Sequence, residues 1–295
     1  MSGQRVRRPR LVAVGDATLA VREWGGRDGA TTVVFWHGLG SFASGAEIVE
    51  VAPRLEAAGF RVVAVDAPGF GESPVLPPER YRLDALGVLL QRLVADLRLE
   101  PLVLIGHSWG AAVVAYYAGE HPDQVRALVL LEGGHFDVCD LPSIDASRPA
   151  EAWIGDARGQ PACWKSREAL ESERRGRMKR FSPELLDAYA AGTRAVGTAL
   201  VGSSAEARGA AMSGLLDRVS GAWPVISMSK IPTLLLLASE PPHADQNRAY
   251  VDAFQAAVPH AITRWVPDAG HNLLADVGPP LGDEIAMWLR GVAKW

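Results

Sequence analysis

The five residues Gly106-His107-Ser108-Trp109-Gly110 constrain this chain of 295 residues more than any other feature. They follow the apolar run Pro101–Ile105 and precede residues 111–119, which have the composition of a helix start. A G-x-S-x-G sequence between a strand and a helix is typical of a sharp turn that exposes its serine. A side chain at either glycine would crowd such a turn. We therefore predict that Ser108 is a nucleophile and that the Trp109 amide faces a developing oxyanion.

The bulk composition is that of an ordinary globular protein. Hydrophobic residues make up 48% of the chain, charged residues 22%, and the net charge is −4, so no nucleic-acid partner is indicated. No apolar run approaches the roughly 18 residues of a membrane span. The start of the chain lacks the apolar stretch of a signal peptide. We expect a cytoplasmic protein that acts on a small molecule. The composition does not indicate which oligomeric state the protein has.

Neither a metal nor an organic cofactor is expected. Cys139 and Cys163 are interpreted as two unpaired thiols, and no Cys/His cluster has the spacing of a zinc site. One segment does resemble a dinucleotide-binding fingerprint: Gly38-x-Gly40-x-x-Ala43 follows a predicted strand, and Asp66 ends the next strand. We favour another interpretation, because a hairpin precedes this unit and the fingerprint leaves the serine turn unexplained.

Up to residue 134 the sequence alternates between short apolar runs and amphipathic stretches. A hairpin comes first, because Leu11–Val14 and Thr18–Trp24 alternate on either side of Gly15-Asp16. Strands are then predicted at 31–36, 61–65, 101–105 and 125–131, and helices at 46–58, 83–97 and from 111. This order implies parallel strands joined by right-handed crossovers.

The rhythm changes between residues 135 and 229. Helical stretches are predicted there at 166–180, 183–195 and 205–219, without a short strand-like run. The earlier pattern then returns, with strands at 233–238 and 261–266 and helices at 246–258 and 282–292. We therefore predict an α/β core of residues 1–134 and 230–295 that carries a helical lid of residues 135–229.

Four motifs, taken in order, resemble those of the α/β-hydrolase superfamily. They are His37-Gly38-Leu39-Gly40 after an early strand, Asp66–Ser73 with the pattern D-x-P-G-x-G-x-S, the Gly106–Gly110 turn, and Gly270-His271 after the last strand. The resemblance covers nearly the whole chain outside the lid. It implies the α/β-hydrolase fold, a mostly parallel sheet with helices on both faces, and a catalytic triad that needs no cofactor.

The resemblance assigns the base that Ser108 requires to His271, since serine alone is a weak nucleophile. Most relatives carry the third member, an acid, after the strand at 233–238, near the position of Pro241 in this chain. Glu240 lies one residue before that position, and Asp245 lies four residues after it. A subset carries the acid one strand earlier, at the position of Glu132. We expect Glu132 to be the acid, with Glu240 and Asp245 as alternatives.

The remaining predictions concern the walls of the site. The backbone amides of Leu39 and Trp109 are expected to form the oxyanion hole. Asp66 is interpreted as a cap whose carboxylate accepts N–H bonds from the loop Gly69–Ser73. Substrate contacts are predicted for a set of residues that otherwise form lid core or structure the oxyanion loop: Trp36, His37, Trp153, Trp164 and Trp223, with Phe181 and Tyr189 as further candidates.

A serine at position 108 narrows the chemistry. Relatives that dehalogenate alkyl halides or open epoxides use an aspartate there, so the resemblance favours acyl chemistry. We predict a serine hydrolase that cleaves a carboxylic ester, lactone or thioester of a small apolar substrate through an acyl-enzyme. The alternatives are a hydrolase-fold binding or receptor protein with little turnover, and a haloperoxidase-type or peptidase-type relative, the latter because its elbow is also G-x-S-W-G.

Overall fold

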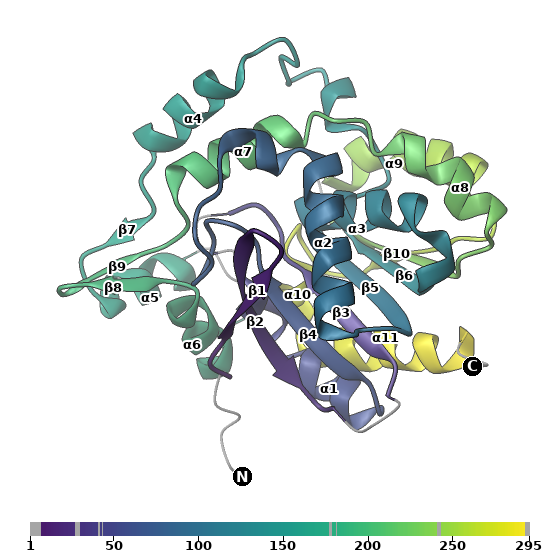
Figure 1. Cartoon of the computed structure of the whole chain (residues 1–295), viewed down its shortest axis with the longest axis horizontal. Helices are drawn as coiled ribbons and strands as arrows, with labels where there is room; N and C mark the ends of the chain where they lie inside the picture. Colours follow the sequence, from purple (N-terminus) through teal and green to yellow (C-terminus); the bar gives the residue numbers. More distant parts are fainter. Residues whose placement is uncertain are drawn as a thin grey trace.

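The computed structural model describes residues 7–26, 30–40, 42, 44–176, 179–180, 182–240 and 243–292. Eight strands form one sheet through the core (Figure 1). In chain order they are β1 (Arg10–Val14), β2 (Ala17–Trp24), β3 (Thr32–Trp36), β4 (Arg61–Asp66), β5 (Leu102–His107), β6 (Val125–Leu131), β10 (Thr233–Ala238) and β11 (Ile262–Val266).

The sheet is mostly parallel. Its strand order is β1-β2-β4-β3-β5-β6-β10-β11. The predicted hairpin is present as β1 and β2, and β2 also pairs antiparallel with β4, whereas the other neighbours run parallel. The carboxyl ends of β5, β6 and β10 therefore lie side by side at one edge, where open parallel sheets place their ligands.

Helices cover both faces of this sheet, as predicted. On one face lie α1 (Ala52–Ala57), α10 (Leu273–Val277) and α11 (Pro279–Val292), and on the other lie α2 (Leu83–Leu97), α3 (Trp109–Glu120), α8 (Trp223–Met228) and α9 (His243–Ala257). The sequence of strand β3 is almost wholly apolar because both of its faces are covered by helices. Val33 and Phe35 pack toward α1 and α11, while Val34 and Trp36 pack toward α2 and α3.

The prediction of a single helix at 46–58 is wrong at its N-terminal end. The chain instead forms a 3₁₀ turn, η1 (Gly45–Ile48), and then begins α1 at Ala52. Pro53 lies in the first turn of α1, where backbone N–H groups have no acceptor within the helix. Its missing N–H therefore costs no hydrogen bond. The apolar spacing continues across both pieces, which is why the sequence pattern does not separate them.

A long insertion lies between β6 and β10. Its α-helices and strands before α8 are α4 (Ala150–Gly159), β7 (Cys163–Trp164), α5 (Arg167–Arg175), α6 (Pro183–Ala191), β8 (Arg194–Val196), β9 (Ala199–Val201) and α7 (Ala205–Gly214). Figure 1 shows α4 and α7 at the top of the view and the small strands at its left, beside α5 and α6. We call residues 135–229 the insertion.

The small three-stranded sheet of the insertion, with the order β7-β9-β8, was not predicted. Its strands have two or three residues, too few to show a period in the sequence. Gly197, with φ 62°, makes the turn between β8 and β9. Helices α5 and α6 are shorter than predicted because each ends at a glycine, Gly176 or Gly192.

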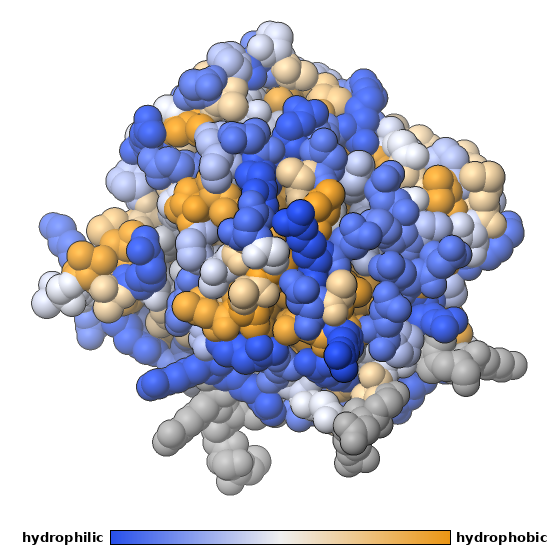
Figure 2. All heavy atoms as spheres, viewed as in Figure 1, coloured by the Kyte–Doolittle hydropathy of each residue, from blue (hydrophilic) through white to orange (hydrophobic). Residues whose placement is uncertain are grey.

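The surface carries apolar residues in several small groups among polar ones (Figure 2). The most exposed large apolar side chains, Leu11, Met228 and Met287, belong to different elements. Within the described ranges, no helix is both long and apolar enough to cross a bilayer. Both cysteines, Cys139 and Cys163, are free thiols, as predicted.

Candidate active site

The turn at Ser108 joins the end of β5 directly to the start of α3. Ser108 adopts φ 53° and ψ −117°, a conformation that ordinary residues avoid and that marks strained, functional positions. The predicted crowding is confirmed. A Cβ at Gly106 would overlap the backbone of Gly110, and one at Gly110 would overlap the carbonyl oxygens of Trp36 and His37. The turn is therefore tight enough to hold the serine hydroxyl in one place.

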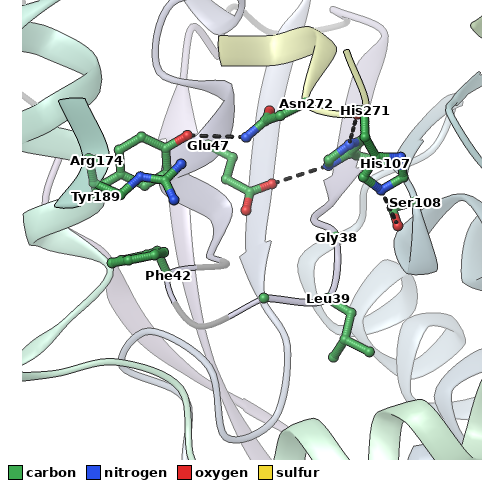
Figure 3. Close-up of a pocket in the computed structure, with 11 residues that line it drawn as sticks. Gly38, Leu39, Phe42, Glu47, His107, Ser108, Arg174, Tyr189, His271 and Asn272 are labelled. Atoms are coloured by element: carbon green, nitrogen blue, oxygen red, sulfur yellow. Dashed lines mark hydrogen bonds and ion pairs between the residues drawn. The ribbon is translucent and has the colours of Figure 1, made fainter. Parts of the chain in front are cut away.

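The structure brings Ser108, His271 and Glu132 together (Figure 3 shows the first two). His271 Nε2 lies 3.0 Å from Ser108 Oγ, and His271 Nδ1 lies 3.2 Å from Glu132 Oε2. Both distances are within reach of a hydrogen bond. One carboxylate, one imidazole and one hydroxyl thus form a continuous chain, the arrangement in which an imidazole removes a serine proton.

Glu132 is held at the carboxyl end of β6. Its side chain is 2% exposed, and its Oε1 accepts a hydrogen bond of 2.5 Å from the Ala238 amide at the end of β10. Burial on its own would raise the pKa of Glu132, but hydrogen bonds from His271 and Ala238 outweigh burial and the pKa is lowered. The carboxylate therefore stays ionised beside His271 at neutral pH.

The two alternative acids lie elsewhere. Glu240 is half-exposed and forms an ion pair with Lys179, a residue of the insertion. Asp245 lies in the first turn of α9, is 76% exposed, and approaches Arg248 at 3.9 Å. The structure thus places Glu132 at Nδ1 of His271 and places these two carboxylates in surface ion pairs.

His107 and Glu47 form a second chain that the sequence reasoning missed. His107 Nε2 is 2.9 Å from the carbonyl oxygen of His271, and His107 Nδ1 is 3.5 Å from Glu47 Oε2. Burial alone would lower the pKa of His107, but Glu47 and the His271 carbonyl outweigh burial and raise it. The backbone of His271 is therefore tied to η1 of the core through His107.

The two residues predicted to supply the oxyanion donors lie near Ser108. Trp109 is the first residue of α3, so its amide has no partner within the helix. Leu39 lines the same pocket as Ser108. His37 is fully buried below this loop: its Nε2 accepts from the Ala67 amide at 3.0 Å, and its Nδ1 lies 2.7 Å from the Gly38 oxygen. These bonds put the ring proton on Nδ1, and burial lowers the pKa of His37, which stays neutral.

Asp66 acts as the predicted cap and does more. It is fully buried, accepts from the Glu72 amide at 3.1 Å and from the Gly45 amide at 2.7 Å, and pairs with the buried Arg22 at 2.5 Å. The capping interpretation is confirmed. A carboxylate committed in this way is not available to a ribose, which removes the support for a dinucleotide site.

A cavity of about 130 Å³ opens at Ser108 (Figure 3). Its walls contain backbone, aromatic and charged groups from both the core and the insertion: Gly38, Leu39, Gly40, Phe42, Glu47, His107, Ser108, Arg174, Tyr189, His271 and Asn272. Two charged side chains, Glu47 and Arg174, share this small space. The cavity is therefore not purely apolar, and the expected apolar substrate stays a prediction.

Most of the predicted substrate contacts are not in this cavity. Trp36 is wholly buried against Trp109, and the Trp223 indole donates to the Gly134 oxygen at 3.1 Å. Trp153 lies under the Arg148 guanidinium, and Trp164 stacks on Phe42. Trp36, Trp164 and His37 are buried, Trp223 packs partly buried against the core, and Trp153 is partly buried outside the core clusters. Phe181 lies outside the described residues.

Among the predicted aromatic residues that the structure describes, Tyr189 alone lines the cavity, and its hydroxyl accepts from Asn272 Nδ2 at 3.1 Å. The sequence reasoning missed Phe42, Glu47, Arg174 and Asn272. Only Asn272 had a local signal, since it follows His271 directly. The other three come from separate elements and meet through the tertiary fold.

Comparison with known proteins agrees with this architecture. A family model described as the alpha/beta hydrolase fold matches residues 31–276. A segment of 124 residues is 36% identical to a 2-hydroxy-6-oxononadienedioate/2-hydroxy-6-oxononatrienedioate hydrolase of Cupriavidus pinatubonensis (strain JMP 134 / LMG 1197), and covers 42% of each chain. A segment of 80 residues is 42% identical to bifunctional epoxide hydrolase 2 of Sus scrofa, covering 27% of this chain and 14% of that one.

These curated relatives are matched over less than half of their length. Among solved structures, the crystal structure of E-2-(acetamidomethylene)succinate hydrolase is similar, with a TM-score of 0.78 and 22% identity, covering 96% of this chain and 98% of that one. At this identity the similarity establishes the fold alone. The predicted fold class is thereby confirmed.

Proposed function

Because the chain belongs to the α/β-hydrolase family, we propose that it is a serine hydrolase that cleaves a carboxylic ester, lactone or thioester bond of a small substrate. The observation that carries this proposal is the unbroken chain from Glu132 through His271 to Ser108, with steps of 3.2 and 3.0 Å. Hydrolase activity is a property of the family, and the ester-type bond is our inference from the serine at the elbow.

In the proposed mechanism, His271 removes the Ser108 proton as Ser108 Oγ attacks the acyl carbon. The amides of Leu39 and Trp109 stabilise the resulting oxyanion, and Glu132 stabilises the imidazolium. The bond to the leaving group then breaks, and His271 returns the proton to that group. Water, deprotonated by His271, attacks the acyl-enzyme, which releases the carboxylic acid and restores the Ser108 hydroxyl.

Epoxide hydrolysis is disfavoured, although one relative is named for it. In the family that reaction uses an aspartate at the elbow, and this chain has Ser108. A neutral hydroxyl requires an adjacent base, and His271 Nε2 stands where that base is needed. The arrangement at Ser108 thus suits acyl transfer.

We further propose that the insertion acts as a lid. Arg174 of α5 and Tyr189 of α6 line the cavity opposite the Ser108 turn, so the insertion supplies one of its walls. A lid of this kind selects the substrate and excludes water from the acyl-enzyme. The core, by contrast, supplies the groups that form and break bonds.

Purified protein assayed against p-nitrophenyl esters of increasing acyl length tests the proposal, with Ser108→Ala in parallel. We expect measurable turnover that falls by about 10⁴- to 10⁶-fold in the variant, while its melting temperature stays unchanged. A fluorophosphonate probe should label the wild type and not the variant. Absence of both turnover and labelling would favour the binding-protein alternative.

A further inference from the structure

Arg174 is the cation of the cavity wall that the mechanism leaves unused. It lies at the end of α5 and lines the same cavity as Ser108. Figure 3 shows Arg174, Tyr189 and Phe42 on one side of this cavity and Ser108, His107 and His271 on the other. A substrate whose reacting carbonyl lies at Ser108 would therefore extend toward the guanidinium.

Aromatic rings fix the position of this guanidinium. Its central carbon lies 4.4 Å from the ring centre of Phe42 and 4.2 Å from that of Tyr189. Phe42 in turn stacks on Trp164 with 4.3 Å between ring centres, and Tyr189 is held by Asn272. Aromatic rings at this distance hold a guanidinium in place, and the N–H groups that they leave unused can bind a planar anion.

The ion pairs of the region set Arg174 apart. Arg167, on the same helix, pairs with Glu171 and Asp187; Lys179 pairs with Glu240, and Arg180 with Glu50. Among the described residues, no carboxylate lies within 4.0 Å of the Arg174 guanidinium, and its buried Nε has no hydrogen-bond partner. A half-buried arginine without a carboxylate partner, facing a cavity, is prepared for an anionic ligand.

We propose that the cavity selects a short acyl substrate that carries a carboxylate, which binds Arg174 while its ester-type carbonyl lies at Ser108. This rests on the proposed function. The cavity, at about 130 Å³, is smaller than the roughly 300–1,000 Å³ of most ligand pockets, so the acyl chain is short.

Glu47, the other charge in the cavity, decides which anion fits. Its Oε2 lies 3.5 Å from His107 Nδ1, on the Ser108 side of the cavity. A dianionic phosphate would face one arginine and be repelled by Glu47. A carboxylate carries a single charge and matches the guanidinium edge with two parallel hydrogen bonds. The site therefore suits a carboxylate better than a phosphate.

Three matched esters test this inference: mono-p-nitrophenyl glutarate, its neutral terminal methyl ester, and p-nitrophenyl butyrate. We expect the wild type to prefer the charged ester in kcat/KM by at least about tenfold. Arg174→Gln should lower kcat/KM for that ester by roughly 10- to 100-fold, mainly through KM, because a charged hydrogen bond is lost. The two neutral esters should change by less than about threefold, and Arg174→Lys should retain part of the preference.

Arg167→Gln, on the exposed side of α5, is the matched control and should leave all three rates unchanged. The inference is overturned if Arg174→Gln lowers the three rates equally, or if the ester of 4-aminobutyrate is preferred, which would point to Glu47 instead. If no ester is hydrolysed by the wild type, the proposed function fails separately. Calorimetric titration of Ser108→Ala with monomethyl and dimethyl glutarate then decides: selective binding of the monoester that is lost on adding Arg174→Gln supports the carboxylate site, and equal binding overturns it.

Discussion

The core sheet and the insertion of this protein are held together by different interactions. In the core, every residue of β3 is buried, and Arg22 and Asp66 form an ion pair in which both side chains are 0% exposed. In the insertion, strands have two or three residues, and the ion pair of Arg167 with Asp187 is about half exposed. Buried polar pairs are costly to break, whereas exposed pairs contribute little.

This difference matches a division of labour. The core carries Ser108, His271 and Glu132, which in our proposal must keep the observed distances of 3.0 and 3.2 Å. The insertion contributes Arg174 and Tyr189 to the cavity, groups that touch only the far end of a substrate in our proposal. In our proposal, chemistry is thus placed on the core sheet and selection on the insertion. The following predictions test this division, beginning with the largest effect.

After Ser108→Ala, Glu132→Gln should reduce turnover most. The variant keeps the shape of the side chain but removes the charge that stabilises the His271 imidazolium, so kcat should fall by about 10³- to 10⁴-fold. The matched controls are Glu240→Gln and Asp245→Asn, which alter exposed carboxylates. Steady-state kinetics of the three variants decide the assignment. A larger loss in either control would show that the acid lies after β10 and not after β6.

Asp66→Asn should destabilise the core far more than Asp187→Asn destabilises the insertion. The first change leaves Arg22 charged and buried without its partner, at a cost of about 3–5 kcal/mol. The second breaks an exposed pair with Arg167 and should cost less than about 1 kcal/mol. Urea unfolding with unchanged m-values measures both. Similar losses for the two variants would contradict the proposed contrast between the regions.

The same contrast explains what the sequence could predict. Helix α2 was predicted at 83–97 and found at Leu83–Leu97, because its apolar residues repeat over four turns. Strand β8, with three residues, offers no such period. Arg174 reads as one charge among many on α5, and only the tertiary contacts with Phe42 and Tyr189 single it out. Local periodicity therefore predicts the core, while the substrate wall depends on contacts distant in sequence.

His135 marks the junction of the two regions and should make it sensitive to acid. It is fully buried, and burial lowers its pKa from 6.5 to about 4. Between these values the unfolded chain binds a proton that the folded chain refuses, so stability falls as pH falls, by up to about 3 kcal/mol near pH 4. In His135→Gln this part of the pH dependence should disappear. The measurement is the free energy of unfolding of both proteins from about pH 7.5 to 4.5. If the two proteins lost stability in parallel as the pH falls, the prediction would be refuted.

Substituting alanine for one glycine in each region should change the free energy of unfolding in opposite directions. These are the smallest effects on stability that we predict. A Cβ at Gly110 would overlap the backbone oxygens of Trp36 and His37, and the shift needed to fit it should cost about 1–3 kcal/mol and disturb the Ser108 turn. At Gly155, within α4, a Cβ meets nothing within 4 Å, so alanine should stabilise the helix by up to about 1 kcal/mol.

Thermal unfolding and ester turnover of Gly110→Ala and Gly155→Ala measure this pair of effects together. We expect the first variant to lose both stability and kcat, since the backbone that carries the nucleophile must move. The second should gain stability and keep its kcat, because α4 holds no residue of the cavity. A loss of kcat in Gly155→Ala would mean that stiffening the insertion limits turnover. The insertion would then take part in the catalytic cycle beyond substrate selection, and the division of labour between the two regions would have to be redrawn.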